Sequence, residues 1–308
     1  MNQPPLEVVL ALGGGAARGL AHIGVIRVLE QHGVVVRGIA GTSIGAIVGG
    51  LFAAGKLNHF EDYICKLDAK GMLRLLDPVV PRAGLIGGNR VVHQLHEFIG
   101  EVQLEDLEIP FCAIATNLET GAEVILRQGS VVDAIRASFA IPGVFTPLQI
   151  NGEWLVDGGV STPVPIQPAR ALFPDLPIIA VNLSNIDNVF AETSETGPAH
   201  PKTEAEREIG RIERLLKRMG GDRNQRPSML TSISDSVLHM ENRISRFQIA
   251  ADQPDLLLEP AVYGVGLFDF HRATPIIAAG AECALQAIEA GALNKLTAKS
   301  HPAHPPRD

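Results

Sequence analysis

Short apolar runs alternate with segments of helical spacing between Glu7 and Leu183, and this alternation limits the possible folds more than any other feature of the chain. Glycine, proline or polar residues bound each run, as they commonly bound buried strands. Five runs predict strands: Glu7–Leu12, Val34–Ile39, Ile109–Ala115, Glu123–Leu126 and Ile178–Leu183. Leu20–Gln31 and Ser43–Ala54 have the apolar spacing of helices. The pattern predicts an α/β fold with helices packed on a mostly parallel sheet, and functional loops at the carboxyl ends of its strands.

The composition indicates a globular protein without a basic surface for nucleic acid. The chain has 308 residues, of which 46% are hydrophobic and 19% are charged, and this length favours one domain. The formal net charge of -8 argues against nucleic-acid partners, because phosphate binding needs an excess of Lys and Arg. Membrane contact through a local patch stays open, because a charge summed over the chain does not reveal patches.

Cysteine usage and the N-terminal residues predict a soluble, unprocessed protein of the cytoplasm. The three cysteines are far apart and odd in number, which indicates reduced thiols and neither a disulfide framework nor a zinc site: Cys65, Cys112 and Cys283. Met1–Leu12 lacks the basic start of a secretory signal. The longest apolar stretch, Ile39–Gly55, is shorter than the roughly 20 residues of a membrane span and contains several glycines.

The pentapeptide Gly41-Thr42-Ser43-Ile44-Gly45 follows a predicted strand and precedes a predicted helix. This context is typical of a nucleophile elbow, in which a sharp turn projects the serine hydroxyl into a pocket. The start of the helix also places unpaired amides near a developing negative charge. By itself the pattern has a second interpretation, since a serine N-cap in a glycine-rich turn has the same sequence.

A glycine-rich loop, residues 13–19, follows the first predicted strand directly. Backbone amides of consecutive glycines can converge on an anion, so the loop could bind either a phosphate or a tetrahedral oxyanion. A dinucleotide-binding pattern fails, because Arg18 stands at its last glycine when counted from Gly13, and Ala16 at its middle glycine when counted from Gly14. The Gly-Lys-Ser/Thr of a Walker loop is also absent from the sequence. Both observations weigh against nucleotide binding.

Asp157 begins the motif Asp157-Gly158-Gly159, after the segment Ile150–Leu155, which is interpreted as leading to an apolar strand end. A carboxylate between a strand end and two glycines can approach a hydroxyl closely, and partial burial raises its proton affinity, so Asp157 could act as a base. A plain Asp-Gly turn is the alternative interpretation of this motif alone.

Taken together and in this order, the three motifs resemble the patatin-like phospholipase family, in particular its compact bacterial members. Further matching segments extend the resemblance over roughly residues 6–290: Gly19–Val25, Ala137–Phe145 and Gly264–Phe270. The resemblance implies a three-layer α/β/α fold with a central, mostly parallel sheet, and one catalytic domain. It also implies a serine acyl-ester hydrolase of the phospholipase A or lysophospholipase type, with phospholipid or lysophospholipid as substrate and with no cofactor or metal.

By the same resemblance, Ser43 is the nucleophile and Asp157 the general base of a Ser–Asp dyad that needs no histidine. The oxyanion hole is implied to consist of the amides of Gly13, Gly14 and Gly15 with the positive charge of Arg18. Gly41 and Gly45 then belong to the elbow, and Gly158 and Gly159 to the aspartate motif. The chain departs from the family at Ala16, where many members have glycine, and at Thr162, where relatives often have asparagine.

Residues 185–250 form a candidate flap or membrane-facing insertion. The segment is charged over Lys202–Arg226, and an apolar stripe of helical spacing follows it: Leu230, Ile233, Val237, Met240, Ile244 and Phe247. The stripe has two interpretations, namely burial against the domain or a surface that faces acyl chains or a membrane. The proline-rich end, residues 301–308, predicts a disordered tail.

Other roles remain open for the histidines and for the chain as a whole. His22 is expected to pack structurally against the sheet, and His271 to lie in a cap or turn before a helix. Possible peripheral membrane contact is a further expectation, while the sequence does not indicate an oligomeric state. A non-catalytic regulatory protein that binds lipid or protein on the same fold, and a nucleotide-binding regulator, are the alternatives to a hydrolase.

Overall fold

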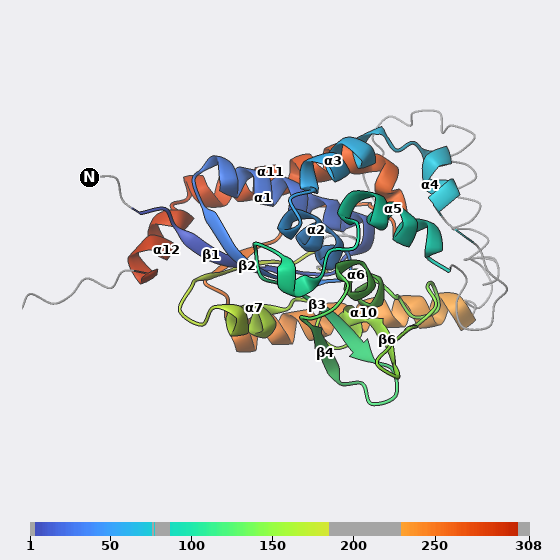
Figure 1. The fold of residues 1–308 in the computed structure, drawn as a ribbon. Helices are drawn as coiled ribbons and strands as arrows, with labels where there is room; N and C mark the ends of the chain where they lie inside the picture. The colour runs from blue at the N-terminus through green and yellow to red at the C-terminus, as the bar shows by residue number, and fades with distance from the viewer. Residues whose placement is uncertain (1–3, 76, 78–86, 185–228, 301–308) are drawn as a thin grey trace, which may run out of the picture.

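The structure is a computed structural model that describes residues 4–75, 77, 87–184 and 229–300 (Figure 1). The charged segment Lys202–Arg226 and the predicted tail at residues 301–308 lie outside these residues. Of the candidate flap, the structure describes the part from residue 229 onward.

The described residues form one eight-stranded sheet in the order β5-β6-β3-β2-β1-β7-β8, with β4 paired to β3. Five strands run parallel: β1 (Glu7–Leu12), β2 (Val35–Thr42), β3 (Phe111–Asn117), β7 (Ile178–Val181) and β8 (Leu256–Leu258). β4 (Glu123–Leu126) and β6 (Glu153–Asp157) pair antiparallel with β3. All five predicted runs are strands, and the mostly parallel sheet is confirmed.

The sequence suggested that Ile150–Leu155 leads into one strand end, but the structure divides this segment between two strands. β5 (Leu148–Ile150) and β6 form an antiparallel hairpin whose turn is Asn151-Gly152. Both turn residues have positive φ, 52° and 88°, which is the conformation that a two-residue hairpin turn requires and that Asn-Gly favours. The turn therefore divides the segment Ile150–Leu155, and β6 then leads into Asp157.

Helices cover both faces of the sheet (Figure 1). One layer contains α1 (Ala21–Gln31), α2 (Ile44–Ala53), α6 (Val131–Ser138) and α11 (Ala273–Glu289), extended by α3 (Leu57–Lys66), α4 (Ala69–Leu75), α5 (Asn89–Ile99) and α12 (Ala292–Ser300). The opposite face carries α7 (Ile166–Leu172) and α10 (Met229–Asp252). Short 3-10 turns are η1 (Ala16–Leu20), η2 (Leu104–Asp106), η3 (Gly158–Val160) and η4 (Asp269–Arg272).

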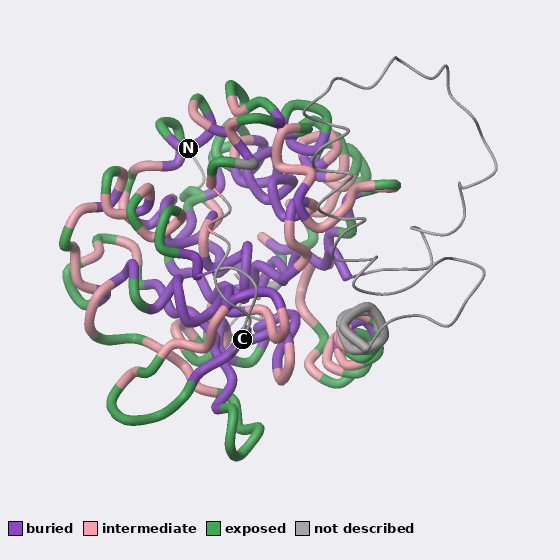
Figure 2. The backbone as a smooth tube through the Cα atoms, turned by 90° about the vertical axis from the view of Figure 1, so that its right-hand side faces the viewer, coloured by how far each residue is buried: buried purple, intermediate pink, exposed green. Residues whose placement is uncertain are grey.

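The side chains of β1 alternate between two hydrophobic clusters. Leu10 packs into the larger cluster, with α1, α2 and α11, whereas Val9 packs into the smaller one, with α7. Residues on a strand point alternately to opposite faces, so an uninterrupted apolar run predicts a strand buried on both sides. The three-layer α/β/α arrangement is therefore confirmed, and Figure 2 shows the buried residues concentrated at the centre of the molecule.

α10 packs on the domain with a different face from the predicted apolar stripe. Asn242 and Ser245 are its buried residues among those with described side chains, whereas Met240 and Phe247 are 59% and 63% exposed. Val237, also in the stripe, lines a cavity. The stripe therefore divides between the interior and the surface, and neither of its two interpretations holds for all of it.

Among the described residues, no single helix is both long and apolar enough to cross a membrane. One bent pair, Asp269–Glu289 with Ala292–Ala298, meets the length and composition criteria together, with a bend of 60°. One face of its first helix packs against α1 in the core.

Candidate active site

Ser43 lies at the sharp turn between β2 and α2 that the sequence predicted. Its φ of 56° and ψ of -121° are strained for a residue other than glycine. The neighbouring glycines have no room for a side chain, since a Cβ at Gly41 would lie 2.5 Å from the Gly45 oxygen and one at Gly45 would lie 2.1 Å from the Leu12 oxygen. The turn is therefore a strained strand-to-helix elbow that exposes the serine to a cavity.

Ser138 holds this elbow in place, a role that was not predicted from the sequence. Its Oγ accepts a hydrogen bond from the Ser43 N–H at 2.9 Å and donates one to the Ile114 oxygen at 2.6 Å. Ser138 is fully buried at the end of α6, within the segment Ala137–Phe145 that extends the family resemblance. The family resemblance indicated that this segment matters, but nothing in its sequence predicted that Ser138 contacts Ser43.

The sheet explains why Ser43 and Asp157 meet. Residues 113–114 of β3 pair with β2 and with β4, and residues 115–116 pair with β6 and with β4. Because β4 occupies one edge of β3, β2 and β6 share the other edge, where their carboxyl ends approach each other. Thr42 ends β2 opposite Ile114, and Asp157 ends β6 opposite the next residue, Ala115. A mixed sheet thus brings together residues that are 114 positions apart.

Ser43 Oγ donates a hydrogen bond of 2.5 Å to Asp157 Oδ2. The other carboxyl oxygen, Oδ1, accepts the Gly159 N–H at 2.7 Å. Gly158 is also required sterically, because a Cβ there would lie 2.3 Å from the Ile114 oxygen. Burial raises the pKa of Asp157 from 3.8 to about 7, while the hydrogen bonds from Ser43 and Gly159 act in the opposite direction. Asp157 is therefore a stronger base than an exposed aspartate.

The glycine loop lies beside Ser43, but two of its amides are already used. The Gly13 N–H donates to the Val181 oxygen at 3.0 Å and the Gly14 N–H donates to the Pro163 oxygen at 2.9 Å. These bonds fix the loop to the carboxyl end of β7 and to the segment after Asp157. The expectation that both amides point at an oxyanion is corrected accordingly. Within the described residues the Gly15 N–H has no acceptor, and Gly15 lines a cavity together with Ser43.

Arg18 ties the same loop together from the side. Its Nε donates to the Gly15 oxygen at 3.2 Å. Burial lowers the pKa of Arg18, and the nearby carboxyl of Glu241 opposes this effect by raising it. The guanidinium group therefore contributes positive charge near the site, and it also supports the conformation of Gly15.

Glu241 of α10 is a second carboxyl group in the site, and no motif in the sequence indicated it. It lines one cavity with Ser43 and Asp157. The pKa of Glu241 is raised to about 8, mainly by burial and also by the charge of Asp157, while Arg18 acts to lower it. In the sequence, only the apolar positions of this helix were considered, and Glu241 lies between them next to Met240. Nothing in its position therefore indicated a role in the site.

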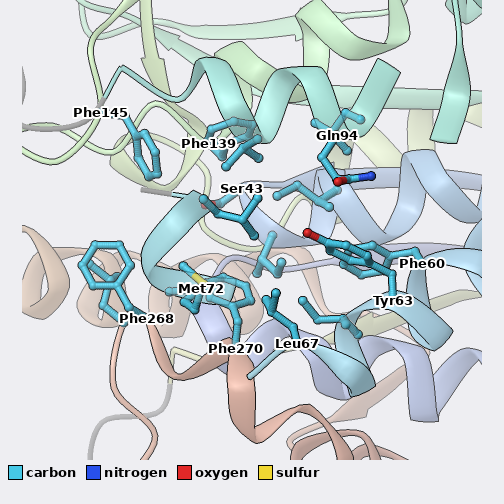
Figure 3. A pocket seen from close by; sticks show the side chains of 18 of the residues that line it. Ser43, Phe60, Tyr63, Leu67, Met72, Gln94, Phe139, Phe145, Phe268 and Phe270 are labelled. Carbon is cyan, nitrogen blue, oxygen red and sulfur yellow. The ribbon is translucent and has the colours of Figure 1, made fainter. Parts of the chain in front are cut away.

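Two cavities meet at Ser43. The larger, of about 110 Å³, is lined almost entirely by apolar and aromatic side chains from α2 to α5, from the segment after α6, and from the segment around η4. Figure 3 shows its aromatic rings, with Tyr63 and Gln94 on the side away from Phe145 and Phe268. The smaller, of about 50 Å³, contains the polar groups of the site. Four residues line both cavities: Ala16, Ser43, Ile141 and Leu267.

The histidines have structural surroundings. His22 is fully buried with Nε2 2.8 Å from the Gly13 oxygen, and burial lowers its pKa to about 4, so its ring is neutral and supports the glycine loop. The structural role expected of His22 is confirmed. His271 lies in η4 directly before α11, at the turn where it was expected. Among the described residues, no group of His, Cys, Asp and Glu has the arrangement of a metal site.

Thr162, one of the two departures from the family resemblance, makes two hydrogen bonds near the site. Its backbone oxygen accepts the Thr42 hydroxyl at 2.8 Å, and its own hydroxyl donates to Glu123 at 2.5 Å. The segment after Asp157 is therefore tied both to the end of β2 and to β4.

A family model for patatin-like phospholipases matches residues 10–170, which include the glycine loop, the elbow and the aspartate motif. The chain belongs to the patatin-like phospholipase family. An uncharacterized NTE family protein of Mycobacterium tuberculosis is 34% identical over 92% of both chains. Lysophospholipase NTE1 of Cryptococcus neoformans is 35% identical over 53% of this chain, which corresponds to 10% of that protein. Family membership supports a lipid acyl hydrolase activity.

Among solved structures, VipD from Legionella pneumophila is similar to 94% of this chain, over 67% of its own length. The TM-score is 0.47 and the sequence identity is 12%, a likeness too distant to say anything about activity.

Proposed function

We propose that this protein is a serine acyl-ester hydrolase of the phospholipase A or lysophospholipase type, with Ser43 and Asp157 as a catalytic dyad. The observation that carries the proposal is the 2.5 Å hydrogen bond between Ser43 Oγ and the buried carboxyl of Asp157, at the point where an apolar and a polar cavity meet. Family membership and the lysophospholipase named among the relatives support the same assignment.

In the proposed reaction, Ser43 Oγ attacks the carbonyl carbon of the ester while its proton passes to Asp157 Oδ2. The resulting tetrahedral oxyanion collapses, the bond to the alcohol breaks, and the acyl group remains on Ser43. Water then attacks the acyl-enzyme and releases the fatty acid. Each half of the cycle needs one proton accepted and one proton donated. The raised pKa of Asp157 suits this role, since a base works best when its pKa lies near the working pH.

We assign the oxyanion donors to the amides of Gly15 and Ala16, in place of the Gly13 and Gly14 amides that the family resemblance implied. Both residues line the polar cavity beside Ser43, where backbone amides can stabilise an oxyanion. The Nε bond from Arg18 to the Gly15 oxygen keeps this part of the loop in position. Losing one such donor costs about 3 kcal/mol of transition-state stabilisation.

The larger cavity suits the acyl chain of a lipid. Its walls are formed by side chains such as Ile47, Leu67 and Phe98, and Ser43 lies at its boundary with the polar cavity. An acyl chain there would exchange water for apolar contacts, at about 0.8 kcal/mol for each buried CH₂ group. The alcohol of the ester would then occupy the smaller cavity, beside Asp157 and Glu241.

The test is hydrolysis by wild-type protein, Ser43→Ala and Asp157→Asn with p-nitrophenyl ester, lysophospholipid and diacyl phospholipid. We expect both variants to lose hydrolysis of every substrate and to keep the fold by circular dichroism. The exposed Ser236→Ala on α10 is the control and should keep full activity. Wild-type protein that hydrolyses none of these substrates and does not react with a fluorophosphonate probe would support the non-catalytic alternative, because only an activated serine reacts at a useful rate.

We also propose peripheral membrane contact through the outer face of α10. Met240 and Phe247 are exposed there, and the Arg243 guanidinium lies 5.5 Å from the centre of the Phe247 ring. Apolar side chains beside a cation are typical of helices that lie on anionic lipid surfaces. The cytoplasmic location expected from the thiols remains a prediction.

A further inference from the structure

Glu241 lies close to the aspartate motif and lines the same cavity as Ser43. A Cβ at Gly159 would lie 2.8 Å from Glu241 Oε1 and 3.1 Å from Asp157 Oδ1, so this glycine stands between the two carboxyl groups. The two oxygens are therefore no further apart than about 6 Å, a range at which one carboxylate strongly affects the protonation of another. Glu241 is thus a direct neighbour of the reacting groups.

The two carboxyl groups differ in their hydrogen bonds. Asp157 uses one oxygen for Ser43 and the other for the Gly159 amide. Glu241 has no hydrogen-bond partner among the described residues, although it lines the small polar cavity. Asp157 is therefore committed to the serine, while the Glu241 carboxyl is available to a group that enters this cavity.

We propose that Glu241 is a second acid–base residue, which protonates the departing alcohol and then takes a proton from the hydrolytic water. The proposal rests on the proposed function, because it assumes an acyl-enzyme on Ser43. The placement of the acyl chain in the apolar cavity directs the alcohol into the cavity that Glu241 lines.

The proton transfers balance over the cycle. In acylation, the Ser43 proton moves to Asp157, the carbon–oxygen bond of the ester breaks, and the Glu241 proton moves to the alcohol oxygen. Asp157 is then protonated and Glu241 is ionised. In deacylation, water gives a proton to Glu241 as its oxygen bonds to the acyl carbon. The bond to Ser43 then breaks, and the serine oxygen regains its proton from Asp157. The site carries one net negative charge throughout, on a carboxylate between the steps and on the oxyanion of each tetrahedral intermediate.

The electrostatic surroundings supply Glu241 in the protonated form that this cycle needs. Burial raises its pKa, and so does repulsion from Asp157, which faces it across Gly159. The guanidinium of Arg18, on η1, is the opposing charge, and it limits the rise in pKa. Near neutral pH the two carboxyls therefore hold one proton between them, because two negative charges so close together repel each other. The cycle starts from the form in which Glu241 carries that proton.

The test compares wild-type protein with Glu241→Gln on two kinds of ester. p-Nitrophenolate leaves without protonation, whereas the glycerol oxygen of a lysophospholipid needs a proton. For Glu241→Gln we expect a normal initial burst of p-nitrophenolate, with an acyl group on Ser43 detected by mass spectrometry, followed by slow turnover. Lysophospholipid hydrolysis should fall by about 10²-fold or more, within the range of general acid–base catalysis. The exposed Glu289→Gln on α11 serves as the control and should behave as wild type.

Two results would overturn the inference while leaving the dyad intact. In one, Glu241→Gln hydrolyses both esters at wild-type rates. In the other, Glu241→Gln loses the burst and the lysophospholipid activity equally while unfolding at the wild-type temperature, which would mean that Glu241 acts on Ser43 and Asp157 rather than on the alcohol. Wild-type protein with no burst and no fluorophosphonate labelling would instead refute the proposed function, and the inference with it.

Discussion

Replacement of Asp157 by asparagine should lower activity and raise stability at the same time. Asparagine has the shape of aspartate, so its Oδ1 can still accept the Gly159 N–H and its amide can still reach Ser43 Oγ. It cannot accept the serine proton. Loss of this base should reduce the rate of acylation by about 10²-fold to 10⁴-fold.

The gain in stability follows from the burial of the carboxyl. Because burial raises the pKa of Asp157 from 3.8 to about 7, the folded protein holds a proton that the unfolded chain releases between these values. Wild-type stability should therefore fall as pH rises from about 4 to about 7 and then level off. A shift of roughly three pKa units corresponds to at most about 4 kcal/mol, since each unit is worth about 1.4 kcal/mol. Asp157→Asn removes this loss.

Urea unfolding at pH 5 and pH 8 measures the effect. The stability advantage of Asp157→Asn over wild type should be larger at pH 8 than at pH 5. Glu241 is present in both proteins, so the difference reports the Asp157 carboxyl together with its repulsion of Glu241. Replacement of an exposed carboxyl, Asp175→Asn, should give no such trend. Equal advantages at both pH values would refute the assignment of a buried, high-pKa carboxyl, and undiminished hydrolysis would refute its role as base.

Three further substitutions test other parts of the structure. Ser138→Ala leaves the buried Ser43 N–H without its acceptor, so urea unfolding should show a loss of about 1–3 kcal/mol and kcat should fall; an unchanged protein would contradict the role of this bond at the elbow. Gly280→Ala places a Cβ 1.9 Å from a backbone oxygen of α1, which should cost about 1–3 kcal/mol in the same assay, and a neutral effect would contradict the close helix contact. Met240→Ser with Phe247→Ser should weaken liposome co-sedimentation several-fold without changing p-nitrophenyl ester hydrolysis; equal sedimentation would remove the proposed membrane face.

The sequence predicted those parts of the protein that depend on local chemistry. Apolar runs bounded by turn residues located five strands, because burial on both faces needs continuous apolar side chains. The glycines around Ser43 predicted the elbow, because they stand where a side chain would collide with backbone. The hairpin before Asp157 was missed although Asn151-Gly152 is a strong turn signal, because the apolar residues on both sides were taken as one run.

Contacts between distant segments could not be predicted from the sequence. Three of the site's features depend on how distant segments fold together, namely the hydrogen bonds already made by the amides of Gly13 and Gly14, the support from Ser138, and the position of Glu241. A glycine-rich loop offers many amides, and its sequence does not say which of them already bond to neighbouring strands. For α10, apolar periodicity alone did not identify the buried face, because the buried side of the helix includes polar residues such as Asn242.

The two cavities divide the chemistry of the site. In the proposed mechanism, acyl-chain recognition depends on apolar walls from α2 to α5 and around η4, whereas the groups that move protons lie in the polar cavity under α10. Both cavities reach Ser43, so the tetrahedral carbon is the point at which the two halves of a lipid ester separate. Changes in the apolar walls should therefore alter preference for acyl length, and changes at Glu241 should alter dependence on the leaving alcohol. If Glu241 protonates the alcohol as proposed, catalysis of alkyl esters depends on α10 being in place, while acylation by activated esters needs the dyad and the glycine loop but not that helix.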